Sequence, residues 1–216
     1  MSINVERKQF PLLYVHQHSR GVVGWGAHKM VGQECQMYGI KHALLVTTGL
    51  KGTGIVEEIE SILKAHDIAV TIFDGVTSNP KDFECKAGTE VYLQAGCDGV
   101  VTVGGGSAHD AGKGIRIMVE NDGVDTSLRD FCAFLDPHYT TRIPTYKVVT
   151  IPQVSVNTTT GTGAEGTAFA IVNDEEWRYK LILVVPGVAP SVGLNDPALM
   201  RMQPPHLIAW AGMDAF

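Results

Sequence analysis

The sequence predicts an α/β fold, a parallel β-sheet with helices on both faces and a short antiparallel extension. Apolar runs of strand length, at 42–47, 69–73 and 99–103, alternate with segments of helical periodicity. Strands that alternate with helices form βαβ units, and their right-handed crossovers bring the carboxyl ends of the strands to one edge of the sheet. A run of three glycines at 104–106 directly follows the third apolar run. We therefore expect a Rossmann-like domain in which ligand-binding loops share that edge.

Composition and charge exclude several classes of protein. Of the 216 residues, 44% are hydrophobic and 19% charged, which is typical of a globular chain. The net charge is −6 and no basic stripe is visible, which argues against nucleic-acid binding. No apolar run has the length of a membrane span, and residues 1–10 lack the apolar core of a secretory signal, so we expect a cytoplasmic protein without a membrane partner.

The first half of the chain contains most of the predicted βαβ units. Residues 10–15 have strand character, and 21–30 are expected to form a glycine-rich turn entering a helix. His16 and His18 could face one side of a strand, but no acidic or thiol side chain is near them, so we expect exposed histidines and not metal ligands. Helices are predicted after the strands at 42–47 and 69–73, on apolar stripes formed by Val56, Ile59, Ile62 and Leu63 and by Phe83, Ala87 and Val91.

The second half is less regular. A polar loop with a short helix around 128–135 is expected, and then a strand at 146–151. Three short apolar runs, at 168–172, 180–185 and 191–194, are too close together for helical crossovers, so they predict the antiparallel extension. Pro205 begins a last helix that continues to the end of the sequence. The four cysteines lack metal-ligand spacing and are expected to be buried or incidental thiols.

The glycine run is the strongest functional signal. Glycines let a backbone approach phosphate groups closely, and the free N–H groups and dipole of a helix N-terminus favour negative charge. Ser107 is expected to cap the helix, with Asp110 completing a capping-box-like pair. The pattern is neither G-x-G-x-x-G nor a Walker A motif. The geometry indicates a diphosphate site, and the alternative is a tight turn without a ligand.

GGGSAHDAGK at 104–113 resembles the GGGS-x-x-D-x-x-K signature of the iron-containing (group III) alcohol dehydrogenases. Further motifs of that family stand before and after it, in the family's order along the chain. They are T-G-x-x-x-x-G near Thr48, FDGVTSNP at 73–80, TTTGTGAEGT at 158–167, Lys180, and DPALMRMQPPHLIAWAGMDAF at 196–216. The TTTGTG stretch by itself would also suit a solvated loop.

The resemblance implies an NAD(P)-binding α/β domain at 1–195. It also implies that 196–216 is a linker and the first helix of an all-helical metal-binding domain. The cofactor-binding residues implied by motif matching are Thr48, Asn79, Gly104, Gly105, Gly106, Ser107, Asp110, Thr158, Thr159, Thr162, Thr167 and Lys180. Asp110 and Lys113 have the i, i+3 spacing of a surface ion pair; we expect Asp110 to support the glycine turn and Lys113 to matter little.

Two departures from the family pattern bear on the cofactor. Many members carry an aspartate after the first strand, where it accepts hydrogen bonds from the adenosine ribose. Thr48 stands at that position with Lys51 nearby, which weakens the rejection of a 2′-phosphate, so NADP is admissible beside NAD. The usual proline-to-threonine junction is replaced by IPQVSVNTTTG at 151–161, which leaves the placement of Thr158 open.

The family holds its metal, Fe²⁺ or in related enzymes Zn²⁺, with one aspartate and three histidines. Asp214 matches the aspartate, and the first matching histidine would fall after the last residue given. The resemblance thus implies the cofactor-binding part of an enzyme that interconverts a primary alcohol or diol and its aldehyde by metal-assisted hydride transfer. This part alone is expected to be inactive, and Leu207, Ile208, Trp210 and Met213 are expected to promote homo-oligomers. The alternatives are a glycerol or polyol dehydrogenase-type enzyme and a non-catalytic nucleotide-binding module.

Overall fold

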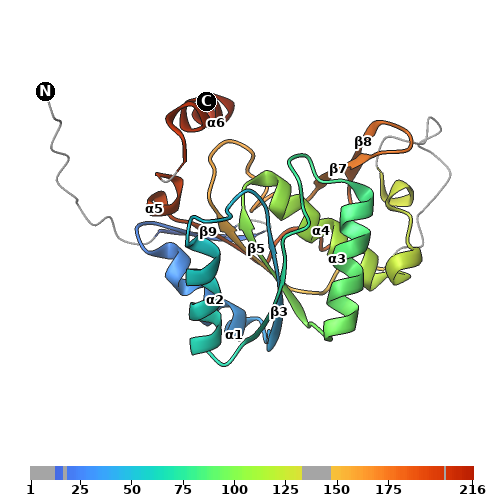
Figure 1. Cartoon of the computed structure of the whole chain (residues 1–216), viewed down its shortest axis with the longest axis horizontal. Helices are drawn as coiled ribbons and strands as arrows, with labels where there is room; N and C mark the ends of the chain where they lie inside the picture. The colour runs from blue at the N-terminus through green and yellow to red at the C-terminus, as the bar shows by residue number, and fades with distance from the viewer. Residues whose placement is uncertain (1–12, 17–18, 133–146, 202) are drawn as a thin grey trace, which may run out of the picture.

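A computed structural model describes residues 13–16, 19–132, 147–201 and 203–216. Within them a seven-stranded sheet forms the centre, and a separate two-stranded antiparallel sheet lies beside it (Figure 1). The strands are β1 (Leu13–His16), β2 (Arg20–Val23), β3 (His42–Thr47), β4 (Ala69–Phe73), β5 (Gly99–Gly104), β6 (Gln153–Asn157), β7 (Ala170–Asp174), β8 (Tyr179–Leu183) and β9 (Val192–Asn195). The α-helices are α1 (Val31–Met37), α2 (Ile55–Ala65), α3 (Asp82–Ala95), α4 (Gly106–Glu120), α5 (Pro197–Met200) and α6 (Pro205–Ala215), with 3₁₀-helices η1 (Ala27–Met30), η2 (Gly123–Asp125) and η3 (Leu128–Phe131).

The order of strands in the large sheet is β1-β2-β9-β6-β5-β3-β4. All neighbouring strands from β2 to β4 pair in parallel, and β1 pairs with β2 antiparallel. The carboxyl ends of β3, β5, β6 and β9 therefore meet at one edge of the sheet. This confirms the predicted α/β fold with a mainly parallel sheet.

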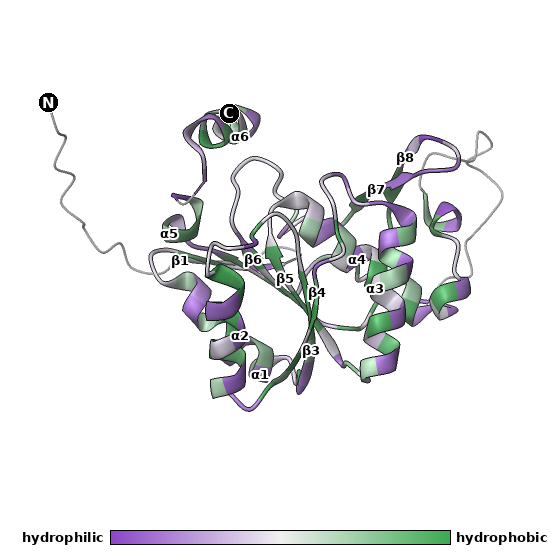
Figure 2. Cartoon of the chain, in the orientation of Figure 1, coloured by the Kyte–Doolittle hydropathy of each residue, from purple (hydrophilic) through white to green (hydrophobic). Residues whose placement is uncertain are grey.

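Two hydrophobic cores lie on opposite faces of this sheet. One is formed with α1 and α2 and includes Leu45, Val101 and Val103. The other is formed with α3 and α4 and includes Leu44 and Val100. Successive residues of a strand point to opposite faces, so a strand covered on both sides is apolar throughout. Figure 2 shows the hydrophobic residues gathered on the central strands and on the helix faces turned toward them.

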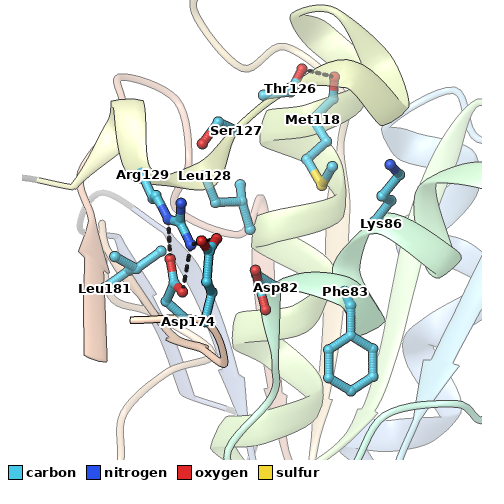
Figure 3. A pocket seen from close by; sticks show the side chains of 11 residues that line it. Asp82, Phe83, Lys86, Met118, Thr126, Ser127, Leu128, Arg129, Asp174 and Leu181 are labelled. Atoms are coloured by element: carbon cyan, nitrogen blue, oxygen red, sulfur yellow. Dashed lines mark hydrogen bonds and ion pairs between the residues drawn. The ribbon is translucent and has the colours of Figure 1, made fainter. Parts of the chain in front are cut away.

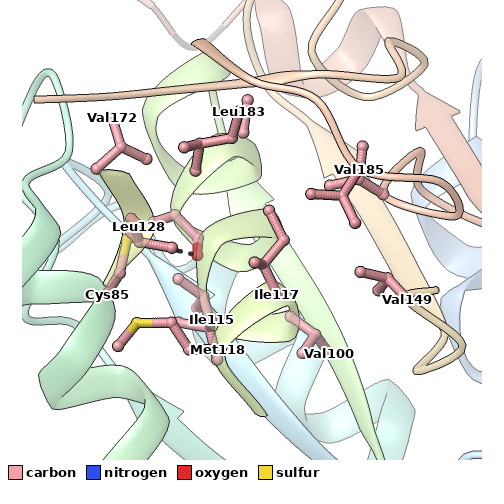
Figure 4. Close-up of a cluster of buried hydrophobic side chains, with 14 of the residues drawn as sticks. Cys85, Val100, Ile115, Ile117, Met118, Leu128, Val149, Val172, Leu183 and Val185 are labelled. Atoms are coloured by element: carbon pink, nitrogen blue, oxygen red, sulfur yellow. Dashed lines mark hydrogen bonds between the residues drawn. The ribbon is translucent and has the colours of Figure 1, made fainter. Parts of the chain in front are cut away.

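Helix α4 fills the second core. Its side chains Ile115, Ile117 and Met118 are buried together with Val172 of β7 and Leu183 of β8 (Figure 4). The antiparallel pair β7–β8 thus covers the side of α4 that the large sheet leaves open. This packing explains why β7 and β8 form a separate layer and do not extend the sheet.

Several predicted elements are confirmed. Strands form at 42–47, 69–73 and 99–104, and the three predicted helices of the first half correspond to α2, α3 and α4. Helix α6 begins at Pro205 as expected. Cys35, Cys85 and Cys97 are buried free thiols and Cys132 is half-buried, and burial raises the pKa of Cys97 to about 11. None of the described helices is long and apolar enough to cross a bilayer.

The strand predicted at 146–151 is wrong for its described part, residues 147–151, which form no strand. The strand is β6, which pairs with β5 from Val100↔Gln153 to Gly104↔Asn157. We interpreted this stretch only as a departure from a family motif, although Gln153, Ser155 and Asn157 alternate with valines as in a strand. Those polar side chains are buried under α4, where hydrogen bonds replace water.

The prediction for 191–194 is wrong in its pairing. Strand β9 lies inside the large sheet and pairs in parallel with both β6 and β2. The connection from β6 to β9 contains the β7–β8 hairpin in place of a crossover helix. Close spacing along the chain therefore did not mean antiparallel pairing, since the two short strands between them belong to another sheet.

The N-terminal region differs from expectation in one respect, because Arg20–Val23 is strand β2, which pairs with β9. The glycine-rich turn enters a helix as predicted, since η1 begins at Ala27 and leads directly into α1 at Val31. Strand β1 covers the described part of the predicted strand at 10–15, and the side chains of His16 and His18 lie outside the described residues. The short helix expected at 128–135 is η3 in its described part.

Candidate functional site

The glycine turn joins the carboxyl end of β5 to the first turn of α4. Gly104 has φ 152°, a value that L side chains rarely adopt, and Gly105 is the N-cap residue of α4. The first N–H groups of an α-helix have no partner inside the helix. A helix N-terminus reached through glycine at the edge of a parallel sheet can bind an anion through its backbone.

A threonine-rich loop, residues 158–167, lies directly against this turn. A Cβ atom at Gly105 would lie 2.8 Å from Thr159 Oγ1, and one at Gly106 would lie 3.0 Å from Thr162 Cγ2. The Thr158 N–H donates to the Gly104 carbonyl at 2.9 Å. The structure thus brings together the two segments that sequence motifs singled out, although more than fifty residues separate them. It also places Thr158 at the first position after β6.

Two buried hydroxyls beside the turn make no hydrogen bond to any described part of the chain. They are Thr47 Oγ1, at the end of β3, and Thr159 Oγ1. A buried hydroxyl without a partner is costly, so such groups usually meet a ligand or water. The hydroxyls, free helix N–H groups and side-chain-free glycines are the chemistry that suits a diphosphate.

Ser107 does not cap α4, contrary to expectation, because the N-cap residue is Gly105, two residues earlier. Its Oγ accepts a hydrogen bond from the Asn79 N–H at 3.1 Å. Asn79 has φ 56°, a left-handed conformation that asparagine tolerates better than most residues. The loop after β4 is therefore tied to the first turn of α4.

Lys180 lies on the other side of that loop. The N–H of Asn173 donates to the Pro80 carbonyl at 2.7 Å, and Asn173 is the register partner of Lys180 in the β7–β8 hairpin. The exposed Lys180 is thus one strand pair away from the Asn79 segment. The structure thus brings Asn79 and Ser107 together, and it connects Lys180 to them only through Asn173 of the neighbouring strand.

Lys113 is far more important structurally than the sequence suggested. Its side chain is fully buried and donates to Asp110 Oδ1 at 3.2 Å, Thr167 Oγ1 at 3.0 Å and the Phe169 carbonyl at 2.6 Å. Burial lowers the pKa of Lys113 and raises the pKa of Asp110, and each charge opposes the shift of the other. The expected surface ion pair is a buried link between α4 and the threonine-rich loop.

Thr48 lies beside the glycine turn, and Asp214 lies beside the threonine-rich loop. The Thr48 carbonyl lies 3.7 Å from where a Cβ on Gly104 would be. Thr48 is half-buried, and as a threonine it offers a hydroxyl and no carboxylate at this position. Asp214 Oδ2 on the exposed helix α6 lies 2.8 Å from where a Cβ on Gly161 would be. Of the described residues, no three His, Cys, Asp or Glu side chains are placed to hold a metal ion together, so Asp214 belongs to no such cluster among them.

A pocket of about 240 Å³ lies away from the glycine turn, between α3, η3 and the hairpin (Figure 3). Arg129 projects into it but is paired with Asp174 and, at 2.6 Å, with Glu176. Its floor includes Leu128 and Leu181. The lining carries two cations, Lys86 and Arg129, and three carboxylates, Asp82, Asp174 and Glu176. Because the carboxylates outnumber the cations, the glycine turn is the stronger candidate for anion binding.

A sequence model of iron-containing alcohol dehydrogenases matches residues 19–197, which contain the glycine turn and the threonine-rich loop. The chain belongs to this family. The 1,3-propanediol dehydrogenase of Klebsiella pneumoniae is 40% identical over 195 residues, which are 89% of this chain and 47% of that protein. The NAD-dependent methanol dehydrogenase of Bacillus methanolicus is 33% identical over 195 residues, 90% of this chain and 48% of that protein.

The same likeness holds in three dimensions. The crystal structure of a 1,3-propanediol oxidoreductase superposes with a TM-score of 0.81 at 38% identity, covering 96% of this chain and 50% of that one. This alcohol dehydrogenase family chain thus spans about half the length of the relatives it matches. Its fold is that of the matched half.

Sequence reasoning missed three residues of the site. Thr47 was assigned only to a strand, His109 was passed over inside the signature, and Asn157 was taken as an interruption of a motif. Asn157 Oδ1 accepts from the Thr159 N–H at 3.2 Å and so shapes the start of the threonine-rich loop. An asparagine two residues before a turn position is a recognisable signal for this kind of bond.

Proposed function

We propose that this chain is the NAD(P)-binding part of an oxidoreductase that transfers hydride between a nicotinamide cofactor and a small primary alcohol or diol, with the aldehyde as the oxidised product. Family membership and the names of the relatives support the reaction class. The observation that carries the cofactor assignment is the packing of Thr159 and Thr162 against Gly105 and Gly106 at the start of α4. We also propose that the protein is cytoplasmic, since such enzymes draw on the cofactor pool of the cell, and that it forms a homo-oligomer.

The proposed binding mode follows from where the residues lie. The diphosphate would contact the backbone of Gly104, Gly105, Gly106 and Ser107, with the free hydroxyl of Thr159 as a further donor. Thr48 at the end of β3 would face the adenosine ribose. Asn79, Thr158, Thr162, Thr167 and Lys180 would surround the ribose and nicotinamide, and Asp110 would support the turn through Lys113.

We propose residues 1–195 as the cofactor domain and 196–216 as the linker and first helix of the metal-binding domain. In this family a bound Fe²⁺, or Zn²⁺, would act as a Lewis acid on the alcohol oxygen. Asp214 is our candidate ligand, but the side chains described do not by themselves fit a metal ion. We therefore assign no step of the reaction to it.

Calorimetric titration with NAD⁺, NADH, NADP⁺ and NADPH tests the proposal. In Gly105→Val the added side chain would overlap Thr159, and affinity should fall about tenfold to hundredfold, as expected for overpacking of about 1–3 kcal/mol. Gly212→Val is the matched control, because a Cβ at Gly212 on α6 meets nothing within 4 Å. Equal affinity in Gly105→Val and the parent would show that the cofactor does not bind at this turn.

A further inference from the structure

The carboxylate of Glu84 closes the loop that carries Asn79. Glu84 is the third residue of α3, and its side chain is buried. Its Oε2 accepts hydrogen bonds from the N–H groups of Lys81 at 3.0 Å and Thr77 at 3.2 Å, and its Oε1 accepts from the Thr77 hydroxyl at 2.7 Å. One side chain therefore binds both ends of the loop 77–81, and Asn79 lies midway between them.

These contacts go beyond helix capping. A glutamate at the third position of a helix ordinarily reaches back to the N–H of the N-cap residue, which is Lys81 here. The two bonds to Thr77 extend that contact to the far end of the loop. The Lys81 ammonium donates to the Thr77 hydroxyl at 2.7 Å and forms an ion pair with Glu84 at 3.8 Å. Because a buried carboxylate is stable only with such partners, the loop must keep this shape for Glu84 to stay buried.

Asn79 has a rarely populated backbone conformation at the middle of this loop. Its φ of 56° is left-handed. Its N–H donates to Ser107 Oγ in the first turn of α4 at 3.1 Å, and its carbonyl accepts from the Asn173 side chain at 3.5 Å. Among the described residues, none forms a hydrogen bond with the exposed carboxamide of Asn79. The backbone of Asn79 is therefore held in place while its side chain stays available to a ligand.

We propose that Glu84 is a positioning residue that, by binding Thr77 and Lys81, holds Asn79 against Ser107 beside the glycine turn. Glu84 is buried and acts through the loop, without touching the cofactor itself. A loop already fixed in its binding conformation loses less conformational freedom when a ligand binds, so the bonds of Glu84 raise the affinity for the cofactor. This effect on affinity rests on the proposed function, whereas the hold on Asn79 does not.

Amide hydrogen exchange in the full chain, followed by NMR without any cofactor, tests the hold on the loop. Glu84→Met removes both oxygens, so exchange of the Asn79 N–H should become at least about tenfold faster, although Glu84 does not bond to this group. Glu84→Gln should stay within about threefold of the parent, because its amide oxygen can replace Oε2 and its amide nitrogen can donate to Thr77 Oγ1. Glu90→Met, at an exposed glutamate of the same helix, is the matched control and should leave the exchange unchanged.

Calorimetric titration measures the consequence for binding, with NADH or NADPH, whichever the parent binds more tightly. Glu84→Met should bind about tenfold more weakly than the parent, Glu84→Gln within about threefold of it, and Glu90→Met like the parent. Thr77→Val, at an exposed position, removes only the hydroxyl that Glu84 accepts from. This variant should bind about threefold more weakly, with about threefold faster exchange at Asn79, and it carries the test if Glu84→Met fails to fold.

Equal exchange of the Asn79 N–H in Glu84→Met and the parent would overturn the hold of Glu84 on the loop. A glutamine variant that behaved like the methionine variant would overturn the assignment to these hydrogen bonds. If the parent bound the cofactor and Glu84→Met bound it equally well, the positioning role would be wrong. If the parent bound no cofactor, the proposed function would fail, while amide exchange would still decide whether Glu84 holds Asn79.

Discussion

The threonine-rich loop can pack against the glycine turn because the glycines have no side chains, and a hydrogen bond from Thr158 to Gly104 also joins the two segments. Thr159 and Thr162 occupy the volume that side chains at Gly105 and Gly106 would need. Any larger residue must displace either the loop or the turn, because interiors are packed too densely to absorb a methyl group without movement. The close approach of the threonine-rich loop to the turn thus depends on the absence of side chains at Gly105 and Gly106.

Thr48 is the residue at which we predict that cofactor choice can be changed. The parent should discriminate between NAD and NADP by no more than about 1 kcal/mol, roughly fivefold, because no carboxylate repels a 2′-phosphate. Thr48→Asp should shift preference toward NAD by about tenfold, through ribose hydrogen bonds and charge repulsion of NADP. Titration of each variant with both cofactors measures the ratio.

Thr48→Asn is the matched control, because asparagine has the shape of aspartate without its charge. This variant should change the ratio of the NAD and NADP affinities much less. If the aspartate and asparagine variants gave the same ratio as the parent, Thr48 would not face the adenosine ribose.

Two buried or half-buried polar side chains link neighbouring elements of the structure. Lys113 joins α4 to the threonine-rich loop, and Arg129 joins η3 to the β7–β8 hairpin through Asp174. The first link holds the irregular threonine-rich loop against α4, and the second holds η3 against the hairpin. Segments without regular hydrogen-bonded neighbours depend on such side-chain links, because their own backbone offers few.

Breaking the Lys113 link should destabilise the fold strongly. Lys113→Met removes the charge from a fully buried side chain and leaves Asp110 without its cation, for which we expect a loss of about 3–5 kcal/mol in urea unfolding. Lys64→Met removes the exposed partner of Glu60, an i, i+4 pair at 2.6 Å, and should cost about 0.5 kcal/mol or less. Similar losses in the two variants would show that Lys113 contributes no more than a surface charge.

The Arg129–Asp174 link should make the stability of the hairpin depend on pH. Hydrogen bonds from Arg129 lower the pKa of Asp174 below its ordinary value. A lowered carboxyl pKa stabilises the fold above the unfolded-state value, about 3.9, and the contribution is lost as pH falls through the lowered pKa. Asp174→Asn should therefore be less stable than the parent at pH 7, with the difference closing toward pH 2.

Urea unfolding of both proteins at pH 7, 5, 3 and 2 measures that difference. Glu175→Gln is the control, since this neighbouring side chain is exposed and should change the free energy of unfolding little at any pH. A parent–variant difference for Asp174→Asn that stayed constant with pH would exclude the ionised pair as its cause.

Helix α6 has no buried residues and does not pack into the α/β layers of the described structure. It lies apart from the sheet in Figure 1, and Trp210 and Met213 are 68% and 70% exposed. Leu207 and Ile208 of the same helix are 41% and 42% exposed. Contiguous exposed apolar residues drive association in water, because burying them releases ordered solvent.

We expect this surface to cause concentration-dependent self-association. The double variant Trp210→Glu, Met213→Glu should weaken the association constant at least about tenfold in sedimentation velocity experiments. Met37→Glu, at an exposed methionine on α1, should have no such effect. Identical sedimentation of all three proteins would exclude α6 as the contact surface.

The sequence by itself determined the elements whose signals are local. Strands β3, β4 and β5 are continuous apolar runs, and α2, α3 and α4 carry helical stripes, so neighbouring residues suffice to predict them. The glycine turn and the TTTGTGAEGT stretch were likewise recognisable, because each motif is contained in a few consecutive residues. The family followed from their order along the chain.

Tertiary structure alone decided whatever depends on partners far along the chain. Strand β6 exists because His109, Thr102 and Arg116 satisfy its polar side chains, and β9 is parallel because β2 and β6 flank it. Lys113 is buried because Thr167 and the Phe169 carbonyl, more than fifty residues away, accept its protons. Burying a polar group is favourable only when its partner is present, and periodicity along one segment carries no information about that partner.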